Sequence, residues 1–370
     1  MSIDVTAAVA RADRTDFAVE PLTLQEPRAD EILVRFTAVG LCHTDLEVLA
    51  GRLPTPRPVG AGHEGVGVVE AVGSAVTGLA PGDKVVASLD SCGSCRSCLA
   101  GQPAYCPQHG ALNFAAQRSD GTVGLTDAAG RPVHDHFFGQ SSFANWGLAH
   151  QRGLVRVDAD LDDTILAPLG CGVVTGAGAV WNALRVQPGS TVAVFGAGAV
   201  GLSAIMAAKA AGAAQIIAVD MHAERLALAA ELGATDGIDA SSADSVREIL
   251  SLTSGEGVDY SVECTGRPEV MASSVEALAA LGTAGILGVA GLDADVRANA
   301  FELLKGRTVI GSVMGHQAPG VLIPRILDLY RRGQFPLERL VRTYPLTNIN
   351  AAVADSRAGK TVKAVLTHTH

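Results

Sequence analysis

The sequence has no excess of basic residues. Its 28 lysines and arginines are outnumbered by 38 aspartates and glutamates, which gives a formal net charge of −10 and a sequence pI near 5.4. A surface that binds nucleic acid or anionic lipid needs clustered Lys and Arg, so this balance argues against both kinds of partner. We therefore expect small-molecule partners.

The sequence also shows no pattern typical of a targeting segment or of a membrane-spanning segment. The N-terminal stretch MSIDVTAAVARADRTD contains acidic residues and lacks the basic segment and long apolar core of a secretory signal. The uncharged stretch 192–208 is interrupted by three glycines and ends at Lys209, just short of the length that spans a membrane. We expect no membrane association and a cytoplasmic location.

Neither internal repeats nor low-complexity tracts occur, and 370 residues are enough for two domains with separate cores. The seven cysteines are an odd number in a long acidic chain without an export signal, which does not favour a disulfide framework. Metal binding is the better interpretation.

The stretch from Thr191 to Asp220 contains a dinucleotide-binding pattern. An apolar run leads into Gly196, Gly198 and Gly201, a spacing that turns a strand sharply into a helix. Gly196 permits the tight turn, Gly198 lets the backbone approach a diphosphate, and Gly201 lets helix and strand pack. Small-residue turns of this form also arise by packing alone, but Asp220 at the end of the next apolar run strengthens the pattern. Its carboxylate can accept both hydroxyls of an adenosine ribose and would repel a 2′-phosphate, which predicts NAD rather than NADP.

Alternating patterns around this stretch predict an α/β fold with a doubly wound sheet of six strands. Strands and turns dominate the first 90 residues, as in a mostly-β lobe. The expected strands are 32–39, 66–72, 84–87, 192–195, the apolar run that ends at Asp220, a strand around 237–238, 258–262, 285–289, 308–312 and 361–367. The expected helices are 173–184, a helix that follows the glycine turn, 222–232, 243–252, 268–278 and 322–331. The final strand is expected to rejoin the first lobe. The polar, glycine-rich stretch 113–140 is expected to run over the surface.

Four cysteines lie close together in a loop that also contains glycine and proline. Cys92, Cys95, Cys98 and Cys106 have the spacing C-x₂-C-x₂-C-x₇-C. Four thiols in a loop with little apolar content can close a tetrahedral zinc site that orders the loop. An iron–sulfur cluster is the rival interpretation, but the last spacing fits neither ferredoxin pattern.

Three further cysteines remain. Cys42 and Cys171 could join His63 in a Cys₂His zinc site that leaves a fourth position open for water or substrate. Each residue alone also has an ordinary structural interpretation: a buried small side chain, a core thiol or a polar turn residue. Cys264, at the end of an expected strand, is assigned to the ordinary class.

A family resemblance strengthens the Cys₂His interpretation. The chain resembles the zinc-dependent medium-chain alcohol dehydrogenases over essentially its whole length, in motifs that follow the same order: GLCHTD at 40–45, GHEGVG at 62–67, the four-cysteine loop 92–106, LGCG at 169–172 and the glycine turn 196–201. Within that family it is most similar to the aryl- and benzyl-alcohol dehydrogenases, through FFGQSSFA at 137–144 and LGCGVVTGAG at 169–178.

The resemblance implies a zinc-assisted hydride transfer from a primary aryl or allylic alcohol to NAD, giving the aldehyde. The residues it assigns to the metal are Cys42, His63 and Cys171 for a catalytic zinc and the four loop cysteines for a structural zinc, hence two zinc ions per chain. Asp45 would orient His63, and Glu64 would lie close behind the metal.

Proton transfer and the substrate pocket are implied in the same way. Thr44 would hand the alcohol proton to the nicotinamide ribose. Glu47 stands where many relatives have a histidine that passes the proton to solvent, so Glu47 or ordered water would complete the relay. Leu53, Phe137 and Phe138 are candidate pocket walls, although aromatic residues in such a run are at least as often core.

For the cofactor, the resemblance assigns each residue a contact. It places Gly196, Gly198, Val200 and Gly201 at the diphosphate turn, Asp220 and Arg225 at the adenosine ribose, Thr175 and Val289 on the nicotinamide side, and His43 and Lys363 at the diphosphate. Relatives often carry arginine at the last two positions, and lysine or neutral histidine is a weaker phosphate clamp.

The implied organisation is a mostly-β, GroES-like catalytic domain (1–172), an NAD-binding Rossmann domain (173–313) and a return to the catalytic domain (314–370). A homodimer or homotetramer joined through the Rossmann sheets near 309–311 is implied as well. Two alternatives remain open: a nicotinoprotein that keeps its NAD bound, and a catalytically silent NAD-binding relative.

Overall fold

The computed structural model describes residues 2–291 and 294–368, which fall into two compact units. The first unit contains residues up to 171, 318–324 and those from 337 onward, and the second contains 172–317 and 325–336. The predicted boundary at 172/173 lies one residue from this division. The predicted return to the catalytic domain at 314 begins too early, since 314–317 lies with the second unit, and 325–336 lies there as well. The Arg325 guanidinium stacks 3.9 Å from the Trp181 ring, and the Phe335 ring lies 6.2 Å from it, so aromatic contacts hold this segment there.

Within the described residues, the second unit holds a parallel sheet of six strands, as predicted. In sheet order the strands are β13 (Asp236–Asp239), β12 (Gln215–Asp220), β11 (Thr191–Phe195), β14 (Val258–Glu263), β15 (Leu278–Ile286) and β16 (Thr308–Gly311). Strand β15 begins well before residue 285, where the pattern predicted its start. The helices are α5 (Gly172–Gly178), α6 (Ala199–Ala210), α7 (Ala223–Leu232), α8 (Ser245–Leu252), α9 (Pro268–Glu276) and α10 (Ala300–Leu303), and α11 (Pro319–Arg331) is shared between the units.

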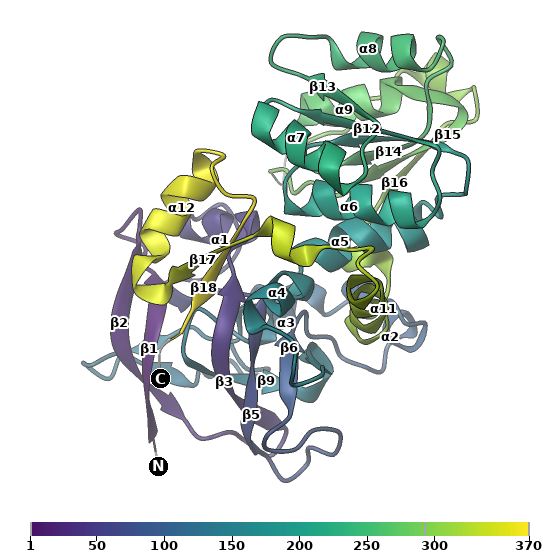
Figure 1. The fold of residues 1–370 in the computed structure, drawn as a ribbon. Helices are drawn as coiled ribbons and strands as arrows, with labels where there is room; N and C mark the ends of the chain where they lie inside the picture. Colours follow the sequence, from purple (N-terminus) through teal and green to yellow (C-terminus); the bar gives the residue numbers. More distant parts are fainter. Residues whose placement is uncertain (1, 292–293, 369–370) are drawn as a thin grey trace. The chain divides into compact units, whose positions relative to one another are not determined.

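The helices cover both faces of this sheet. Helices α5, α6 and α7 neighbour one another on one face, and α8 and α9 lie together on the other (Figure 1). The apolar core against the sheet includes Phe195, Ile217 and Val258. Strand order reverses between β11 and β14, and in open sheets of this kind ligands bind at the carboxyl ends of the strands where the order reverses.

The first unit is built from two largely antiparallel sheets. One has the order β4 (Val59–Gly60), β1 (Ser2–Ala10), β2 (Phe17–Gln25), β7 (Leu125–Thr126) and β8 (Pro132–Val133). The other has the order β10 (Leu154–Arg156), β6 (Lys84–Ala87), β5 (Gly65–Val72), β3 (Glu31–Gly40), β18 (Lys363–Thr367) and β17 (Val341–Pro345), with β9 (Trp146–His150) also paired to β3. Strand β18 pairs antiparallel with β3, so the chain does return to the first lobe as predicted.

Helices in the first unit are short. They are α1 (His43–Leu49), α2 (Arg96–Leu99), α3 (His109–Asn113), α4 (Asp163–Leu166) and α12 (Ile349–Arg357). Among the residues that the structure describes, no single helix is long and apolar enough to cross a membrane. The adjoining segments 163–170 and 172–183 meet those criteria only when they are taken together.

The stretch 113–140 is only partly the surface segment that its polarity predicted, because residues 119–122 and 128–132 are exposed whereas both ends of the stretch are largely buried. Arg118, Asp135 and His136 are buried, and so is the rest of the stretch from there to residue 140. Their charges are paired: Arg118 donates to both carboxylate oxygens of Glu31 at 2.6 and 3.0 Å, and the His136 Nε2 lies 3.3 Å from the same carboxylate. Polar side chains that satisfy one another can be buried, and composition alone does not reveal the pairing.

This network makes stability depend on pH through His136. Burial lowers the pKa of His136, but Asp135 and Glu31 outweigh it and raise the pKa to about 9. A raised pKa in the folded protein means that the charged imidazole stabilises the fold below its unfolded pKa, and that this contribution is lost as pH rises through about 9. Glu31 has a depressed pKa, through the His136 and Arg118 hydrogen bonds that overcome its burial, and loses its contribution only in acid.

We therefore expect His136→Asn to lower the melting temperature at pH 7 and to bring it closer to that of the unmodified protein at pH 10. Asparagine tolerates the left-handed backbone at this position, where φ is 64°. Melting curves of the two proteins at both pH values provide the measurement. A difference that stays the same at pH 7 and pH 10 would contradict the assignment.

Candidate active site

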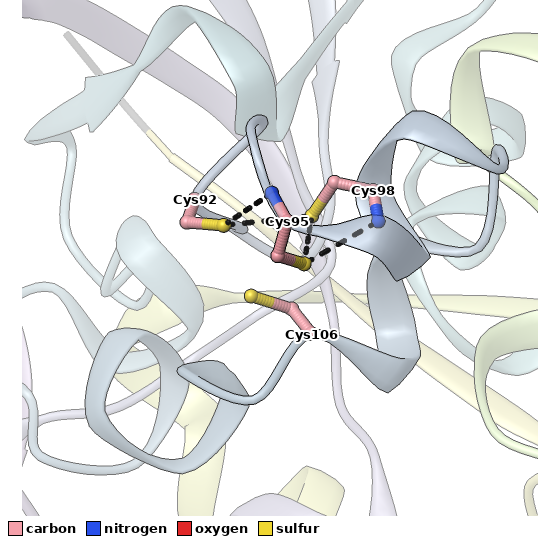
Figure 2. Close-up of side chains that lie close together, drawn as sticks. All are labelled: Cys92, Cys95, Cys98 and Cys106. Carbon is pink, nitrogen blue, oxygen red and sulfur yellow. Dashed lines mark hydrogen bonds between the residues drawn. The ribbon is translucent and has the colours of Figure 1, made fainter.

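The four loop cysteines converge on one point. Figure 2 shows the thiols of Cys92, Cys95, Cys98 and Cys106 directed toward one another around α2. Their sulfur atoms all lie within 4.8 Å of one another, with Cys95 and Cys98 3.5 Å apart and Cys92 and Cys98 3.9 Å apart. Four sulfurs at Zn–S bonds of about 2.3 Å in a tetrahedron lie about 3.8 Å apart. The group fits a closed zinc site.

Backbone N–H groups support the anionic form of these thiols. The N–H of Cys95 donates to the Cys92 sulfur at 3.3 Å, and that of Cys98 donates to the Cys95 sulfur at 3.5 Å. Hydrogen bonds from the backbone of Ser94 and Cys95 lower the pKa of Cys92 to about 6, whereas burial raises the pKa of Cys106 to about 11. A thiolate is therefore already present near neutral pH to bind a metal cation.

A second group of possible ligands forms in the first unit. Cys42 caps the start of α1, His63 lies just before β5, and Cys171 follows the helical turn Ala167–Gly170. Ligand atoms of these three residues and of Glu64 all lie within 4.8 Å of one another. Among the described residues, these four and the loop cysteines are the groups able to hold a metal ion.

The buried imidazole of His63 provides the test of metal binding. Its Nδ1 lies 2.9 Å from Asp45 Oδ1, and the same carboxylate accepts the N–H groups of Cys42 and Gly62 at 3.0 and 3.1 Å. Its Nε2 has no hydrogen-bond partner among the described residues, although the side chain is fully buried. A buried ring nitrogen is rarely left unpaired, so Nε2 beside two thiols fits a metal ligand.

The groups around His63, Cys42 and Cys171 favour a positive charge among these three side chains. Burial lowers the pKa of His63, but Asp45 and Cys42 outweigh it and raise the pKa well above its usual range. A hydrogen bond from Cys171 lowers the pKa of Cys42, and the same interaction raises the pKa of Cys171. One thiolate therefore forms readily, and a cation is needed to stabilise both.

Lys363 has a partner that the sequence did not suggest. Its buried ammonium lies 2.9 Å from each carboxylate oxygen of Glu64 and 3.2 Å from the carbonyl oxygen of Leu41. Burial lowers the pKa of Lys363, but Glu64 outweighs it and raises the pKa above its usual value. The three ammonium donors are thus engaged inside the first unit, and the predicted diphosphate contact stays a prediction.

Thr44 and Glu47 both lie on α1. The hydroxyl of Thr44 is 3.8 Å from the Cys42 sulfur, so it faces the second ligand group. Glu47 accepts two hydrogen bonds from Arg52 at 2.6 and 2.5 Å and lies 3.1 Å from the His43 ring. The Arg52 hydrogen bonds lower the pKa of Glu47, which makes this carboxylate a poor proton acceptor near neutral pH. Arg52 was not among the residues singled out from the sequence.

Aromatic rings pack around His63. The Phe138 ring stacks on the imidazole with centroids 4.5 Å apart, and Phe137 approaches it edge-on at 5.6 Å. Phe114, which the sequence analysis did not select, meets Phe138 edge-on at 5.3 Å and is only partly buried. Leu53, the third predicted pocket wall, is also partly buried.

The glycine turn of the second unit has the predicted backbone geometry. Gly196 has φ of 93°, a conformation that side chains disfavour. A Cβ on Gly201 would lie 1.8 Å from the Gly196 carbonyl oxygen, so this glycine lets α6 pack against the turn. A Cβ on Gly198 would meet nothing within 4 Å, so the backbone there is open to a ligand. Val200 follows in the first turn of α6.

Asp220 ends β12 with its carboxylate held in place. It accepts the N–H groups of Ala197 and His222 at 2.7 and 2.9 Å, and the His222 ring nitrogen lies 2.9 Å from it. Arg225 Nη1 is 3.9 Å from the carboxylate. Sequence reasoning missed His222. Asp220 and Arg225 therefore lie together, as the predicted ribose contacts require.

The two residues expected on the nicotinamide side differ in exposure. Thr175, on α5, is buried with its hydroxyl 3.9 Å from the Met314 sulfur. Val289 is 53% exposed and follows β15, in the half of the sheet beyond the reversal point.

A metal held by Cys42, His63 and Cys171 would keep one position open, which suits the oxidation of an alcohol, and a cofactor bound to the dinucleotide unit would be the hydride acceptor. The fold and these groups define the class of metal-dependent, dinucleotide-using dehydrogenases.

Comparison with known proteins gives the family. The alcohol dehydrogenase GroES-like domain matches residues 28–158, and the zinc-binding dehydrogenase domain matches residues 199–328. Geraniol dehydrogenase of Castellaniella defragrans is 43% identical over 366 residues, covering 98% of each chain. The chain belongs to the zinc-dependent medium-chain alcohol dehydrogenases.

Solved structures agree over the full length. Benzyl alcohol dehydrogenase from Acinetobacter calcoaceticus is 43% identical with a TM-score of 0.95, covering 99% of this chain and 100% of that one. An alcohol dehydrogenase zinc-binding domain protein from Burkholderia ambifaria is 50% identical with a TM-score of 0.97, covering 100% of both chains. The predicted fold class, a Rossmann domain with a GroES-like domain, is confirmed.

The two glycines of the turn should respond differently to substitution. Gly201→Ala forces a backbone clash and should lower the melting temperature. Gly198→Ala should melt normally but bind the nicotinamide dinucleotide about 10-fold more weakly or worse, an effect of about 1.4 kcal/mol. Melting curves and calorimetric titration separate the two effects. Normal cofactor binding by Gly198→Ala would exclude a close diphosphate contact.

Proposed function

We propose that this alcohol dehydrogenase oxidises primary aryl and allylic alcohols with NAD, through a catalytic zinc held by Cys42, His63 and Cys171. The observation that carries the proposal is the buried, unpartnered Nε2 of His63 beside two thiols, with Nδ1 fixed by Asp45. The zinc would act as a Lewis acid that polarises the alcohol oxygen.

The protein groups around this position have separate tasks in the proposal. Asp45 orients the imidazole and increases its basicity as a ligand. Thr44 would accept the alcohol proton and pass its own hydroxyl proton to the nicotinamide ribose, a role that its position on the first turn of α1 beside Cys42 supports. Glu47 is held by Arg52, so we assign the last proton step to water or to Glu47 after Arg52 has moved away.

We expect the purified protein to carry two zinc ions per chain. Cys95→Ser should lose stability, because a closed four-cysteine site contributes folding free energy, whereas Cys171→Ser should fold but lose turnover and one zinc. Elemental analysis beside activity and melting measurements checks this. Cys264→Ser, a cysteine outside both groups, is the matched control and should keep both metals. A single zinc in fully active protein would refute the two-site assignment.

Cofactor choice is the second part of the proposal. We expect NAD to be preferred over NADP by at least about 10²-fold in kcat/KM, since a charge mismatch between a 2′-phosphate and the buried Asp220 is worth several kcal/mol. Asp220→Ser should narrow the gap, with Arg225 positioned to help the phosphate. Asp239→Ser, at the end of the neighbouring strand β13, should keep the preference. Equal use of both cofactors by the unmodified enzyme would contradict the NAD assignment.

The substrate class rests on the relatives and on the aromatic surroundings. One relative is named for benzyl alcohol and another for geraniol, an allylic alcohol, and both are 43% identical to this chain. Conjugation stabilises the aldehyde and the partial positive charge that develops as hydride departs. An aryl group also adds binding area at about 25 cal/mol per Å². Phe138 and the partly buried Phe114 are the walls we assign to this pocket.

Steady-state comparison of four alcohols tests the substrate class. We expect kcat/KM for benzyl alcohol and a long-chain allylic alcohol to exceed that for ethanol. The Thr44 methyl group should disfavour 2-propanol by about 1–3 kcal/mol, and Thr44→Ser should reduce that penalty. If ethanol matches benzyl alcohol, or 2-propanol exceeds both, the aryl and allylic assignment is wrong.

A homo-oligomer completes the proposal. Strand β16 is an edge of its sheet, paired with β15 alone in the described sheet, and its Val309 side chain is 38% exposed. An exposed edge with apolar side chains can pair with a second copy. Mass measurement in solution tests whether a dimer or tetramer forms.

A further inference from the structure

Gln140 is a buried amide whose side chain makes four hydrogen bonds, one of them to the backbone of His63. Its Nε2 donates to the carbonyl oxygens of His63 and Ser88 at 3.0 and 3.1 Å. Its Oε1 accepts the N–H of Gly65 at 3.0 Å and the hydroxyl of Ser142 at 2.9 Å. Only 1% of the residue is exposed. Both amide protons and both oxygen lone pairs are thus used, which fixes the backbone on either side of Glu64.

Ser88 links this hydrogen-bond network to the backbone beside Cys171. Its hydroxyl donates to the carbonyl oxygen of Gly170 at 2.7 Å, directly before Cys171. Space is tight there, since a Cβ on Gly170 would lie 2.8 Å from the Cα of Glu64 and 2.6 Å from the Ala87 carbonyl oxygen. The backbone beside Cys171 is therefore packed directly against the backbone beside His63.

We propose that Gln140 and Ser88 are positioning residues for the catalytic metal. The inference rests on the zinc site proposed above. Gln140 holds the peptide of His63 to Ser88, and Ser88 holds the peptide that precedes Cys171. Together they set the separation of the His63 and Cys171 ligand atoms, although neither side chain is itself a ligand. Groups that orient ligands in this way change metal affinity by about 10- to 100-fold when removed.

An apolar side chain of the same size as Gln140 could not position the two ligand segments. An apolar side chain in place of Gln140 occupies the space but leaves the carbonyl oxygens of His63 and Ser88 without this donor. Each buried backbone group that loses its partner destabilises its position, so both ligand segments gain freedom to shift. The structural zinc loop 92–106 receives none of the Gln140 hydrogen bonds, and its metal should be unaffected.

Metal release from the zinc-loaded enzyme tests the inference. The variants are Ser88→Ala, which removes one hydroxyl, and Gln140→Met, which keeps the size of the side chain. Ser261→Ala is the matched control, because Ser261 is also fully buried and also donates one hydrogen bond of 2.7 Å to a carbonyl oxygen, in the second unit. The readouts are the rate of transfer of each zinc to a chromophoric chelator, the visible spectrum of the cobalt-substituted enzyme, and the melting temperature.

We expect both variants to release one of their two zinc ions about 10-fold faster than the unmodified enzyme, with the second ion unchanged and an altered cobalt spectrum. Ser261→Ala should release both ions at the unmodified rate. Release within about 2-fold of the unmodified rate by Ser88→Ala overturns the inference, as does equal acceleration for both ions. Should Gln140→Met fail to fold, Ser88→Ala decides alone. An unmodified enzyme with only one zinc would overturn the proposed function and this inference with it, whereas unchanged release from a two-zinc enzyme overturns the inference alone.

Discussion

The carboxylate of Asp45 is the group on which the proposed zinc site most depends. It is fully buried, it accepts the N–H groups of Cys42 and Gly62, and it holds the ring of His63. The same hydrogen bond from Cys42 caps the first turn of α1. One side chain thus starts a helix, joins two distant loops and orients a ligand. Loss of it would leave several buried donors unpaired, at about 1–3 kcal/mol each, so folding and metal binding would fail together.

The charges in this buried region are balanced one against another. Two thiolates would neutralise a divalent cation, and the remaining charged groups already have partners: Asp45 with His63, and Glu64 with Lys363. A low-dielectric pocket tolerates charges only when they are paired in this way. The proposed zinc position could therefore be dry without carrying a large net charge, and a dry position would strengthen the electrostatic interactions made there.

Local signals in the sequence predicted most of this arrangement. The glycine turn at 196–201 and the cysteine spacing at 92–106 act over a few residues, and the strands on either side follow from short apolar runs. Pairings between residues far apart in the chain were not predictable. Lys363 meets Glu64, and Gln140 meets His63, through contacts that no spacing encodes. For the same reason the two ends of the polar stretch 113–140 were wrongly placed on the surface, because Arg118 is paired with Glu31 of β3 and Gln140 with Gly65 of β5.

The position of strand β18 in the chain determines the order in which the two units can be completed during synthesis. It pairs with β3 inside the sheet of the first unit, yet in the chain it follows all of the second unit. A chain emerging from the ribosome therefore presents Cys42, His63 and Cys171 long before Lys363 is made. Domains tend to fold as they are synthesised. During that interval Glu64 lacks its ion pair with Lys363, so a nascent first unit is without the buried ammonium that the finished sheet supplies. The second unit, which consists of 172–317 and 325–336, has no such dependence, and its fold can be complete before the sheet around the proposed zinc ligands is.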